Sequence, residues 1–450
     1  MPSTAIESRM FGRLYSTDEM KEIFSDKAWV QRWIDAEAAL AQAQGELGII
    51  PEEKARLINK YNKAEALNIE HIGELFNSSI TLVPFLTEYK SILPENAGEF
   101  VHWGATTQDI FDTGLVLMQR DAYRLILRDM KLCLSHCLDL AEKYKHTLMA
   151  GRTHAVHAIP ITFGFKAAVW ADELGRDIER LQDMAKRVFV GQFSGAVGTM
   201  ASAPEHCFAV QKRMMQILGL EIPVISWYAS RDSQAEFLSV LAICAGTLGR
   251  INHEIFSLQR TEILELEEPF FSGKVGSSTM PHKRNPAVVE NVLAICRNLR
   301  SLQPGMLEAM IGENERDFGC YMSEWETIPH ACHLMGAALE KSKHILKNLI
   351  VYPEHMERNL LAQKGLMMSE SVMMHLAGKL GRITAHDLIH DFCMQAYEEE
   401  KPLKEILERS ALISESFSAT EIEDMLDPHN YLGAATDFVD HVCEHWRARC

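Results

Sequence analysis

Residues 276–286 read GSSTMPHKRNP and gather two serines, a histidine, a lysine, an arginine and an asparagine in one short stretch. The preceding residues, SGKV, add serine and glycine, which is typical of a mobile loop that can close over a site. PHKRNP then places three cationic or potentially cationic side chains before a predicted helix start. A helix N-terminus beside a lysine is a good site for a carboxylate.

This combination of groups suits removal of a proton from a carbon atom next to a carboxylate. The lysine and the helix dipole would stabilise the dianionic, enolate-like intermediate that forms. A serine can serve as the base only if its pKa is strongly lowered, which a cationic site could achieve. The stretch therefore predicts a serine base near an anchored dicarboxylate.

Three other polar stretches interrupt the apolar pattern: HWGATTQD at 102–109, AGRTHAVHAIPITFG at 150–164 and GQFSGAVGT at 191–199. Each alone has an ordinary structural explanation. Thr106 and Thr107 could cap the helix that follows, because threonine is a common N-cap residue. A single histidine such as His154 is more often a satisfied structural group than a catalyst. The four stretches gain meaning only if the fold brings them together.

Long helices are predicted to position these stretches. Residues 28–47 are rich in strong helix formers. Residues 112–144, 235–260 and 288–306 carry apolar side chains at alternating steps of three and four, and the first half of 235–260 is apolar nearly all round, which implies burial on several sides. This periodicity over long segments predicts an all-α protein built around a bundle with coiled-coil-like packing.

Turn residues near 92–104 and near 350 suggest a division into three helical domains. We predict a small N-terminal helical domain at 1–105, a central long-helix bundle domain at 106–350 and a small C-terminal helical domain at 351–450. No internal repeat is visible.

Composition excludes several classes of protein. The net charge of −17 and the lack of a Lys/Arg run argue against nucleic acid as a partner. The N-terminal residues contain no apolar core of signal-peptide length, and no apolar stretch is long enough for a membrane span. The cysteines show no CxxC pairs, and the Cys/His groups at 133–137 and 441–445 lie in helical patterns, where cysteine usually behaves as a small apolar residue. A reduced, cytoplasmic protein is predicted.

GSSTMPHKRNP resembles the signature of the fumarase/aspartase superfamily, whose members eliminate fumarate from succinyl compounds. The resemblance covers nearly the whole chain, because HWGATTQD, GRTH, SRDSQAE, ENERD and LDPHNYLG follow in the family's order. The chain is most similar to the branch of adenylosuccinate lyase and 3-carboxy-cis,cis-muconate cycloisomerase. The resemblance implies three helical domains, a homotetramer whose active sites each draw on three subunits, a small dicarboxylate substrate, and no cofactor or metal.

The resemblance also assigns roles to individual residues. Ser277 would be the catalytic base, and His154 would be the general acid. The remaining positions would bind substrate, with Lys283, Asn285 and the two threonines holding its carboxylates. These substrate-binding candidates are His102, Thr106, Thr107, Gln108, Arg231, Ser278, Lys283, Asn285 and Arg316.

Departures from the family pattern argue against a nucleotide substrate. Adenylosuccinate lyases hold the phosphate with two arginines and a serine, at positions that are Leu14, Trp325 and Tyr321 here, although Arg13 could replace the first. A histidine of a His-Asp pair in those enzymes falls within residues 77–79, which read NSS. Cleavage of adenylosuccinate is therefore disfavoured.

Two features divide the lyase from the cycloisomerase. SEWETIP at 323–329 and Gln108 follow the cycloisomerase pattern, but His154 stands where that enzyme typically has tryptophan. A retained histidine indicates a leaving group that must be protonated, most simply an amine. We therefore predict a carbon–nitrogen lyase that releases fumarate from an N-substituted aspartate. The cycloisomerase is the main alternative, and a non-catalytic, crystallin-like structural protein is the alternative from another class.

Overall fold

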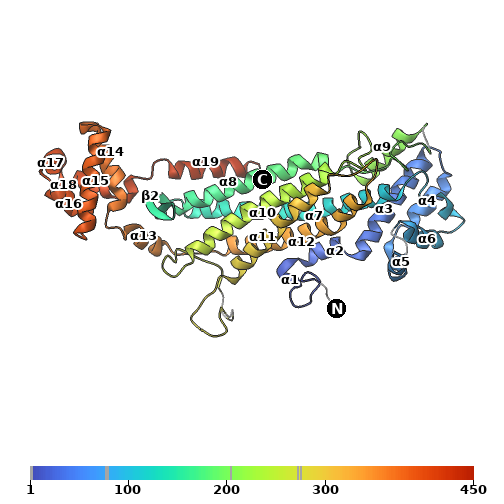
Figure 1. Cartoon of the computed structure of the whole chain (residues 1–450), viewed down its shortest axis with the longest axis horizontal. Helices are drawn as coiled ribbons and strands as arrows, with labels where there is room; N and C mark the ends of the chain where they lie inside the picture. The colour runs from blue at the N-terminus through green and yellow to red at the C-terminus, as the bar shows by residue number, and fades with distance from the viewer. Residues whose placement is uncertain (1–3, 77–80, 203–204, 271–272, 274–275, 450) are drawn as a thin grey trace. The chain divides into compact units, whose positions relative to one another are not determined.

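A computed structural model describes residues 4–76, 81–202, 205–270, 273 and 276–449 (Figure 1). The chain divides into two compact units. The first unit consists of Met1–Met130, Asp177–Gly249 and Asn291–Lys341, and the second of Lys131–Arg176, Arg250–Glu290 and Ser342–Cys450. The prediction of an all-α fold is confirmed. The three-domain division with boundaries at 105 and 350 stays a prediction.

The longest elements are helices in each segment where the sequence showed apolar periodicity. They are α3 (Asp26–Glu46), α7 (Thr107–Lys143), α8 (Phe163–Val188), α10 (Asp232–Leu258), α11 (Ala287–Glu308) and α12 (Phe318–Lys347). The predicted helices at 28–47, 112–144, 235–260 and 288–306 are thus confirmed, with ends that differ by a few residues.

Shorter helices complete the first unit. They are α1 (Gly12–Tyr15), α2 (Asp18–Ile23), α4 (Glu52–Lys60), η1 (Ala64–Ala66), α5 (Ile69–Phe76), α6 (Val83–Ser91), η2 (Ala97–Phe100) and α9 (Cys207–Leu218). Within this unit the segments of α7, α10, α11 and α12 run alongside one another, and hydrogen bonds such as Gln119 to Gln234 link neighbouring helices (Figure 1).

The second unit holds the strands found among the described residues. These form two antiparallel pairs, β1 (Leu148–Thr153) with β2 (Val156–Thr162), and β3 (Leu266–Glu267) with β4 (Ile350–Val351). The remaining elements are helical: α13 (Pro353–Leu361), η3 (Leu366–Met368), α14 (Ser369–Leu380), α15 (Arg382–Glu398), α16 (Leu403–Arg409), α17 (Ala411–Ser416), α18 (Ala419–Leu426), η4 (Pro428–Asn430) and α19 (Ala435–Arg447). An apolar core within α14–α18 holds the end of the chain together.

The apolar stripes form the core of the long helices. On α10 the whole stripe is buried, with Phe237, Leu241, Cys244 and Leu248 all at 0% exposure. Ile243 lies between them on another face and is 47% exposed. On α7 Leu115, Met118 and Ala122 are also buried, whereas Leu132, further along the same helix, is 41% exposed. One face of each of these two helices is therefore buried in the core, and some apolar side chains on the same helices are exposed to solvent in the single chain.

Candidate active site

The first and third polar stretches meet at the buried carboxylate of Asp109, in the first turn of α7. This carboxylate accepts hydrogen bonds from the backbone N–H groups of Thr106 at 2.9 Å, Ser194 at 2.8 Å and Gly195 at 3.1 Å. The hydroxyl of Tyr228 donates to the same group. Two loops that are far apart in the sequence are therefore held together by one acidic side chain.

The environment of Asp109 is unusual for a charged group because the side chain is fully buried. Burial raises the pKa of Asp109 to about 6, although its four hydrogen bonds favour the ionised form. Thr106 and Asp109 have the spacing of a capping box, in which the third helical residue reaches back to the residue before the helix. This local signal explains why the chain turns into α7 at Thr107.

His102 is positioned by a second buried acid, Glu37 of α3. Its backbone N–H donates to Glu37 Oε2 at 2.9 Å, and its Nδ1 lies 2.6 Å from Glu37 Oε1. Burial opposes the charged imidazole, but the charge of Glu37 and its hydrogen bond outweigh that effect and raise the pKa of His102. This contact leaves Nε2 as the ring nitrogen that a substrate could meet.

Arg316 connects the same two polar stretches from a third direction. Its Nη2 donates to Thr106 Oγ1 at 3.3 Å and to the carbonyl of Ala196 at 3.0 Å, and its guanidinium lies 5.0 Å from the centre of the Tyr228 ring. Its Nε is buried, and none of the described atoms serves as its hydrogen-bond partner. The fold thus brings together Thr106 and Arg316, two of the predicted substrate-binding residues.

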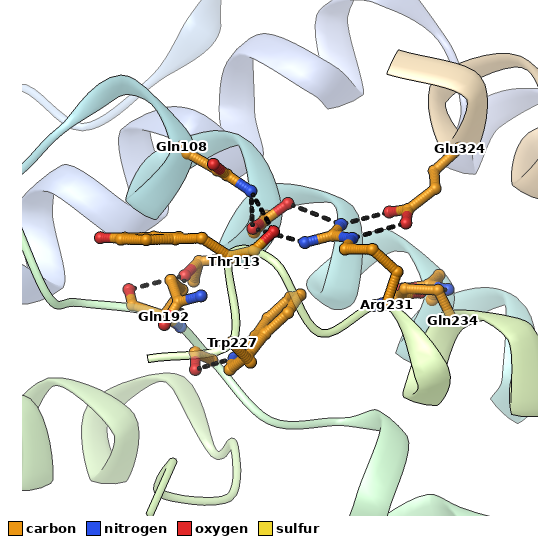
Figure 2. Close-up of polar contacts among 11 residues, drawn as sticks. Gln108, Thr113, Gln192, Trp227, Arg231, Gln234 and Glu324 are labelled. Atoms are coloured by element: carbon orange, nitrogen blue, oxygen red, sulfur yellow. Dashed lines mark hydrogen bonds and ion pairs between the residues drawn. The ribbon is translucent and has the colours of Figure 1, made fainter. Parts of the chain in front are cut away.

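Arg231 belongs to a buried network of polar side chains (Figure 2). Its guanidinium donates to Asp112 of α7 through two bonds of 3.0 Å and to both carboxylate oxygens of Glu324 of α12. These bonds use four of its five N–H donors. The Arg231 side chain is 1% exposed. Arg231 therefore joins the starts of α7 and α12, and its predicted contact with substrate stays a prediction.

Gln108 belongs to the same network. Its side chain is fully buried, and Nε2 lies 3.1 Å from Asp112 Oδ2 and 3.3 Å from the carbonyl of Tyr228 (Figure 2). Its Oε1 has no hydrogen-bond partner among the described atoms. The neighbouring Thr107 begins α7 and is half-buried. The substrate-binding roles of Gln108 and Thr107 also stay predictions.

Replacing Arg231 by methionine should destabilise the protein strongly, because two buried carboxylates would lose their shared cation. Loss of one partner of a buried ion pair costs about 3–5 kcal/mol. Arg250→Met is the control, because Arg250 lies in α10, the helix that begins directly after Arg231, and its pair with Glu173 is partly exposed, and such pairs contribute about 0–1 kcal/mol. Urea unfolding of both variants measures the difference. A similar loss for both would contradict the buried network.

The loss in Arg231→Met should also depend on pH. Burial raises the pKa of Glu324 to about 7, while Arg231 holds it down. The pKa of this carboxyl is higher in the folded state than its unfolded value of about 4.3. Such a group stabilises the fold fully below that unfolded value, and this contribution is lost as the pH rises through the folded-state pKa. Without Arg231 the folded pKa rises further. The variant should therefore be less destabilised at pH 6, where Glu324 is neutral, than at pH 8.

In the second unit, His154 stands at the tip of the β1–β2 hairpin. Thr153 pairs with Val156, so His154 and Ala155 form a two-residue loop, with φ of 51° and 65°. Positive φ at both positions is the geometry of a type I′ turn, which usually needs Asn or Gly. The His154 side chain is exposed. Positive φ is uncommon for residues other than glycine, so a histidine held in this conformation at an exposed tip is a candidate functional group.

The hairpin is anchored near its tip by a largely buried ion pair. Arg152 donates to both oxygens of Glu265, at 2.6 Å and 2.9 Å, and Asn359 Nδ2 donates to Glu265 at 2.9 Å. The Glu265 side chain is fully buried. Because Arg152 lies two residues before His154, this pair fixes the direction in which the tip projects.

The signature loop folds back on itself and places Gly276, the residue before Ser277, against the backbone of Lys283. A Cβ atom at Gly276 would lie 2.4 Å from the carbonyl oxygen of Lys283, so only glycine allows this approach. Ser277 Oγ accepts hydrogen bonds from the backbone N–H groups of Thr279 at 3.3 Å and Met280 at 3.1 Å. Two such donors favour a negative charge on the oxygen. The same bonds also shape the turn.

The predicted carboxylate site at the start of α11 needs a correction. The chain's own Glu268 occupies this helix N-terminus, where it accepts from the N–H groups of Val288 at 3.0 Å and Val289 at 2.9 Å. The helix dipole therefore stabilises a protein carboxylate. The sequence could not reveal this, since Glu268 reaches the helix through the tertiary fold.

A cavity of about 760 Å³ opens beside the signature loop. Lys283 and Asn285 contribute to its lining, together with Arg284, which pairs with Glu267 at 3.3 Å. Ser278 and Lys283 are exposed, and Asn285 is partly buried. Ser277, Lys283 and Asn285 thus share one loop, but no contact among the described residues joins them to His154. Residues 272, 274 and 275 of the predicted lid and residues 77–79 lie outside the described residues.

The described part of the chain contains no group of three His, Cys, Asp or Glu side chains placed to hold a metal ion. Cys133 and Cys137 are both buried at 0% exposure. In the same part of the chain, no helix has the length and apolar character needed to span a membrane.

Sequence analysis missed the acids that position the candidates, namely Glu37, Asp109, Glu265 and Glu268. The Thr106–Asp109 spacing is a readable capping signal. The other three acids act across long sequence separations, where no local pattern exists.

Comparison with known proteins places this arrangement among lyases. A family model described as "Lyase" matches residues 12–300, and one described as "Adenylosuccinate lyase C-terminus" matches residues 365–442. The chain is 41% identical over 450 residues to an N-acetyl-S-(2-succino)cysteine lyase of Enterococcus italicus, covering 100% of this chain and 99% of the relative.

Two further relatives extend the comparison. A 3-carboxy-cis,cis-muconate cycloisomerase of Acinetobacter baylyi is 36% identical over 443 residues, covering 97% of this chain and 98% of the relative. The crystal structure of a fumarate lyase from Mesorhizobium sp. BNC1 aligns with a TM-score of 0.89 and 36% identity, covering 96% of this chain and 98% of that one. The similarity therefore includes both units and all the polar stretches.

Proposed function

Because the chain belongs to the fumarase/aspartase superfamily and is an enzyme of the lyase class, we propose that it eliminates fumarate from a succinyl adduct of a small amine or thiol. The observation that carries this proposal is the full-length similarity to a lyase named for a succinylated cysteine derivative. Ser277, Lys283, Asn285 and His154 are all present, which supports a catalytic protein over a structural one.

Ser277 is the proposed base. Its alkoxide removes the proton from the carbon next to one carboxylate, and the electron pair forms a dianionic, enolate-like intermediate. Collapse of this intermediate forms the carbon–carbon double bond of fumarate and expels the nitrogen or sulfur with its bonding electrons. His154 delivers a proton to the departing atom as its bond to carbon breaks. The two N–H donors on Ser277 Oγ support the lowered pKa that the first step needs.

The substrate carboxylates are assigned to four of the predicted binding residues. Lys283 and Asn285 hold one carboxylate, and Thr106 and Thr107 hold the other, with Ser278 beside the base. Arg316 supplies donors beside Thr106, and His102, held by Glu37, is the other donor of the proposed site, as these contacts support. Gln108 and Arg231 complete the binding residues of the proposal, chiefly by holding the start of α7.

The leaving atom is either nitrogen or sulfur. The presence of His154 favours nitrogen, because an amine must be protonated as it leaves. The relative named N-acetyl-S-(2-succino)cysteine lyase favours sulfur. The second candidate function is cycloisomerisation of 3-carboxy-cis,cis-muconate, which the relative from Acinetobacter baylyi and the segment SEWETIP support. Release of fumarate distinguishes the two functions.

A homotetramer with shared active sites completes the proposal. Large apolar side chains on four long helices are exposed in the single chain, which supports burial against other subunits; they are Leu132, Val169, Ile243 and Leu307. The exposed tip of the hairpin with His154 supports a role in a neighbouring subunit's site. Light scattering should give a tetramer, and a stable, active monomer would contradict the assembly. A cytoplasmic location also belongs to the proposal, and the nine cysteines among the described residues, none of which forms a disulfide with another of them, support it.

Adenylosuccinate should be a poor substrate, because the positions expected to bind its phosphate offer no cation. Leu14 is 42% exposed, and Tyr321 and Trp325 pack ring to ring at 5.5 Å. A phosphate dianion without charged donors in a closed site loses several kcal/mol. The value of kcat/KM should therefore be far lower for adenylosuccinate than for a compact succinyl adduct. A higher value would mean that Arg13 or other groups replace the missing contacts.

A further inference from the structure

The first unit contains an aromatic cavity of about 380 Å³ between α3, α5, α7 and α12. Its walls include Trp29, Trp33, Phe76, Phe111 and Trp325. Trp33 and Phe111 meet with ring centres 5.0 Å apart, and Phe111 and Trp325 meet at 5.1 Å. This volume falls in the range of small-molecule sites, about 300–1,000 Å³. None of the groups assigned to catalysis uses this cavity.

The cavity adjoins the substrate-binding end of α7. Phe111 lies four residues after Thr107, so both side chains occupy the same face of the helix, one turn apart. Asp112 and Glu324 are the two carboxylates that share Arg231. Phe111 directly precedes the first of them, and Trp325 directly follows the second. The buried ion pairs therefore fix the separation of the two rings. One helical turn, about 5–6 Å between Cβ atoms, therefore separates Thr107 from Phe111 in the cavity wall.

The lining determines which chemistry the cavity accepts. Apart from aromatic rings it is aliphatic, and Asp26 is the one charged side chain among its described lining residues. A carboxylate or phosphate would meet no cation and would face the charge of Asp26, so its desolvation would cost several kcal/mol. An uncharged aromatic or branched alkyl group would gain about 25 cal/mol for each Å² of apolar surface removed from water.

We propose that this cavity is the subsite for the leaving group and that it receives an uncharged, apolar substituent carried by the departing nitrogen or sulfur. The inference rests on the proposed elimination reaction and adds the class of leaving group to it. Trp325, which stands where nucleotide-cleaving relatives are expected to have arginine, is then a specificity-determining wall of the site.

Gly73 offers a direct way to fill the cavity. It lies on α5 in the cavity lining, and a Cβ atom added there would meet no atom within 4 Å. Leucine at this position should also strengthen the helix, because glycine is about 1 kcal/mol less favourable than alanine in helices. Gly378→Leu on α14 is the matched control, since it also has open space around it.

The kinetic test compares the benzyl and methyl adducts of succinate, linked through whichever atom, sulfur or nitrogen, the enzyme releases faster. Wild-type enzyme should prefer the benzyl adduct by about tenfold in kcat/KM and should disfavour the 4-carboxybenzyl adduct. Gly73→Leu should abolish the preference for benzyl and leave the methyl adduct unchanged, while Gly378→Leu should behave as wild type. An unchanged preference in Gly73→Leu would overturn the proposal.

A binding test separates this inference from the reaction itself. Benzyl alcohol, which cannot react, should quench the fluorescence of Trp29, Trp33 and Trp325 saturably in wild type, and this binding should be lost in Gly73→Leu. If the wild-type enzyme binds benzyl alcohol but cleaves no succinyl adduct, the proposed function fails while the cavity still binds its ligand class. Saturable binding that is equal in wild type and Gly73→Leu would show that the cavity is not the site.

Discussion

Replacement of Ser277 by alanine should lower kcat about 10²- to 10⁴-fold, the range typical for loss of a general base. KM should change little, because the substrate carboxylates are assigned to other residues. A fall in kcat and kcat/KM of equal size marks an interaction made only in the transition state. Steady-state kinetics with a succinyl adduct measure the effect, and thermal unfolding checks that the fold is intact.

An alternative explanation of such a loss is structural. In that case Ser277 Oγ would only shape the turn, by accepting hydrogen bonds from the backbone N–H groups of Thr279 and Met280. Ser277→Asn tests this, because an asparagine side chain can make the same kind of turn but cannot act as a base. This variant should stay inactive. Thr279→Ala is the neighbouring control and should retain activity, since the backbone N–H of residue 279 makes the contact. Recovery of activity in Ser277→Asn would remove the proposed base.

Replacement of His154 by asparagine should separate nitrogen from sulfur as the leaving atom. Without a proton an amine would have to leave as an amide anion, a far stronger base than the thiolate that a thiol with a pKa near about 8.5 releases. Fumarate release should therefore fall about 10²- to 10⁴-fold for an N-substituted aspartate. For the matching thioether the fall should be roughly tenfold or less.

Ser277→Ala is the control for this experiment. Its loss of fumarate release should be equal for the N-substituted aspartate and for the thioether, because both reactions begin with proton removal from carbon. An equal loss for both atoms in His154→Asn would mean that His154 does not protonate the leaving group. If the chain is a cycloisomerase, His154→Trp should retain activity with 3-carboxy-cis,cis-muconate.

The helices could be predicted from the sequence because their apolar stripes are long and regular. The stripe of α10 begins at Phe237 and ends at Leu258, and each of its members is buried. The hairpin with His154 gave no comparable signal, because its two-residue loop contains His and Ala in place of Asn or Gly. Ion pairs such as Arg152 with Glu265 are also unreadable, since 113 residues separate the partners.

Part of the candidate site could be predicted from the sequence. Ser277, Lys283 and Asn285 share one short loop, so their proximity followed from the sequence. The meeting of Thr106 with Arg316 did not, because it depends on how Asp109 gathers two distant loops. The expected free helix N-terminus was wrong for a similar reason, since Glu268 fills it from a separate segment.

The central claim is that the enzyme releases fumarate from a succinyl adduct, and the most direct measurement is a substrate screen followed by ultraviolet absorbance. Purified protein is mixed in parallel with N-substituted aspartates, S-(2-succino)cysteine derivatives, adenylosuccinate and 3-carboxy-cis,cis-muconate, with Ser277→Ala as the control for each. The account predicts that fumarate appears from at least one amine or thiol adduct, with only a trace in the control. Turnover of carboxymuconate alone, without fumarate from any adduct, would contradict it.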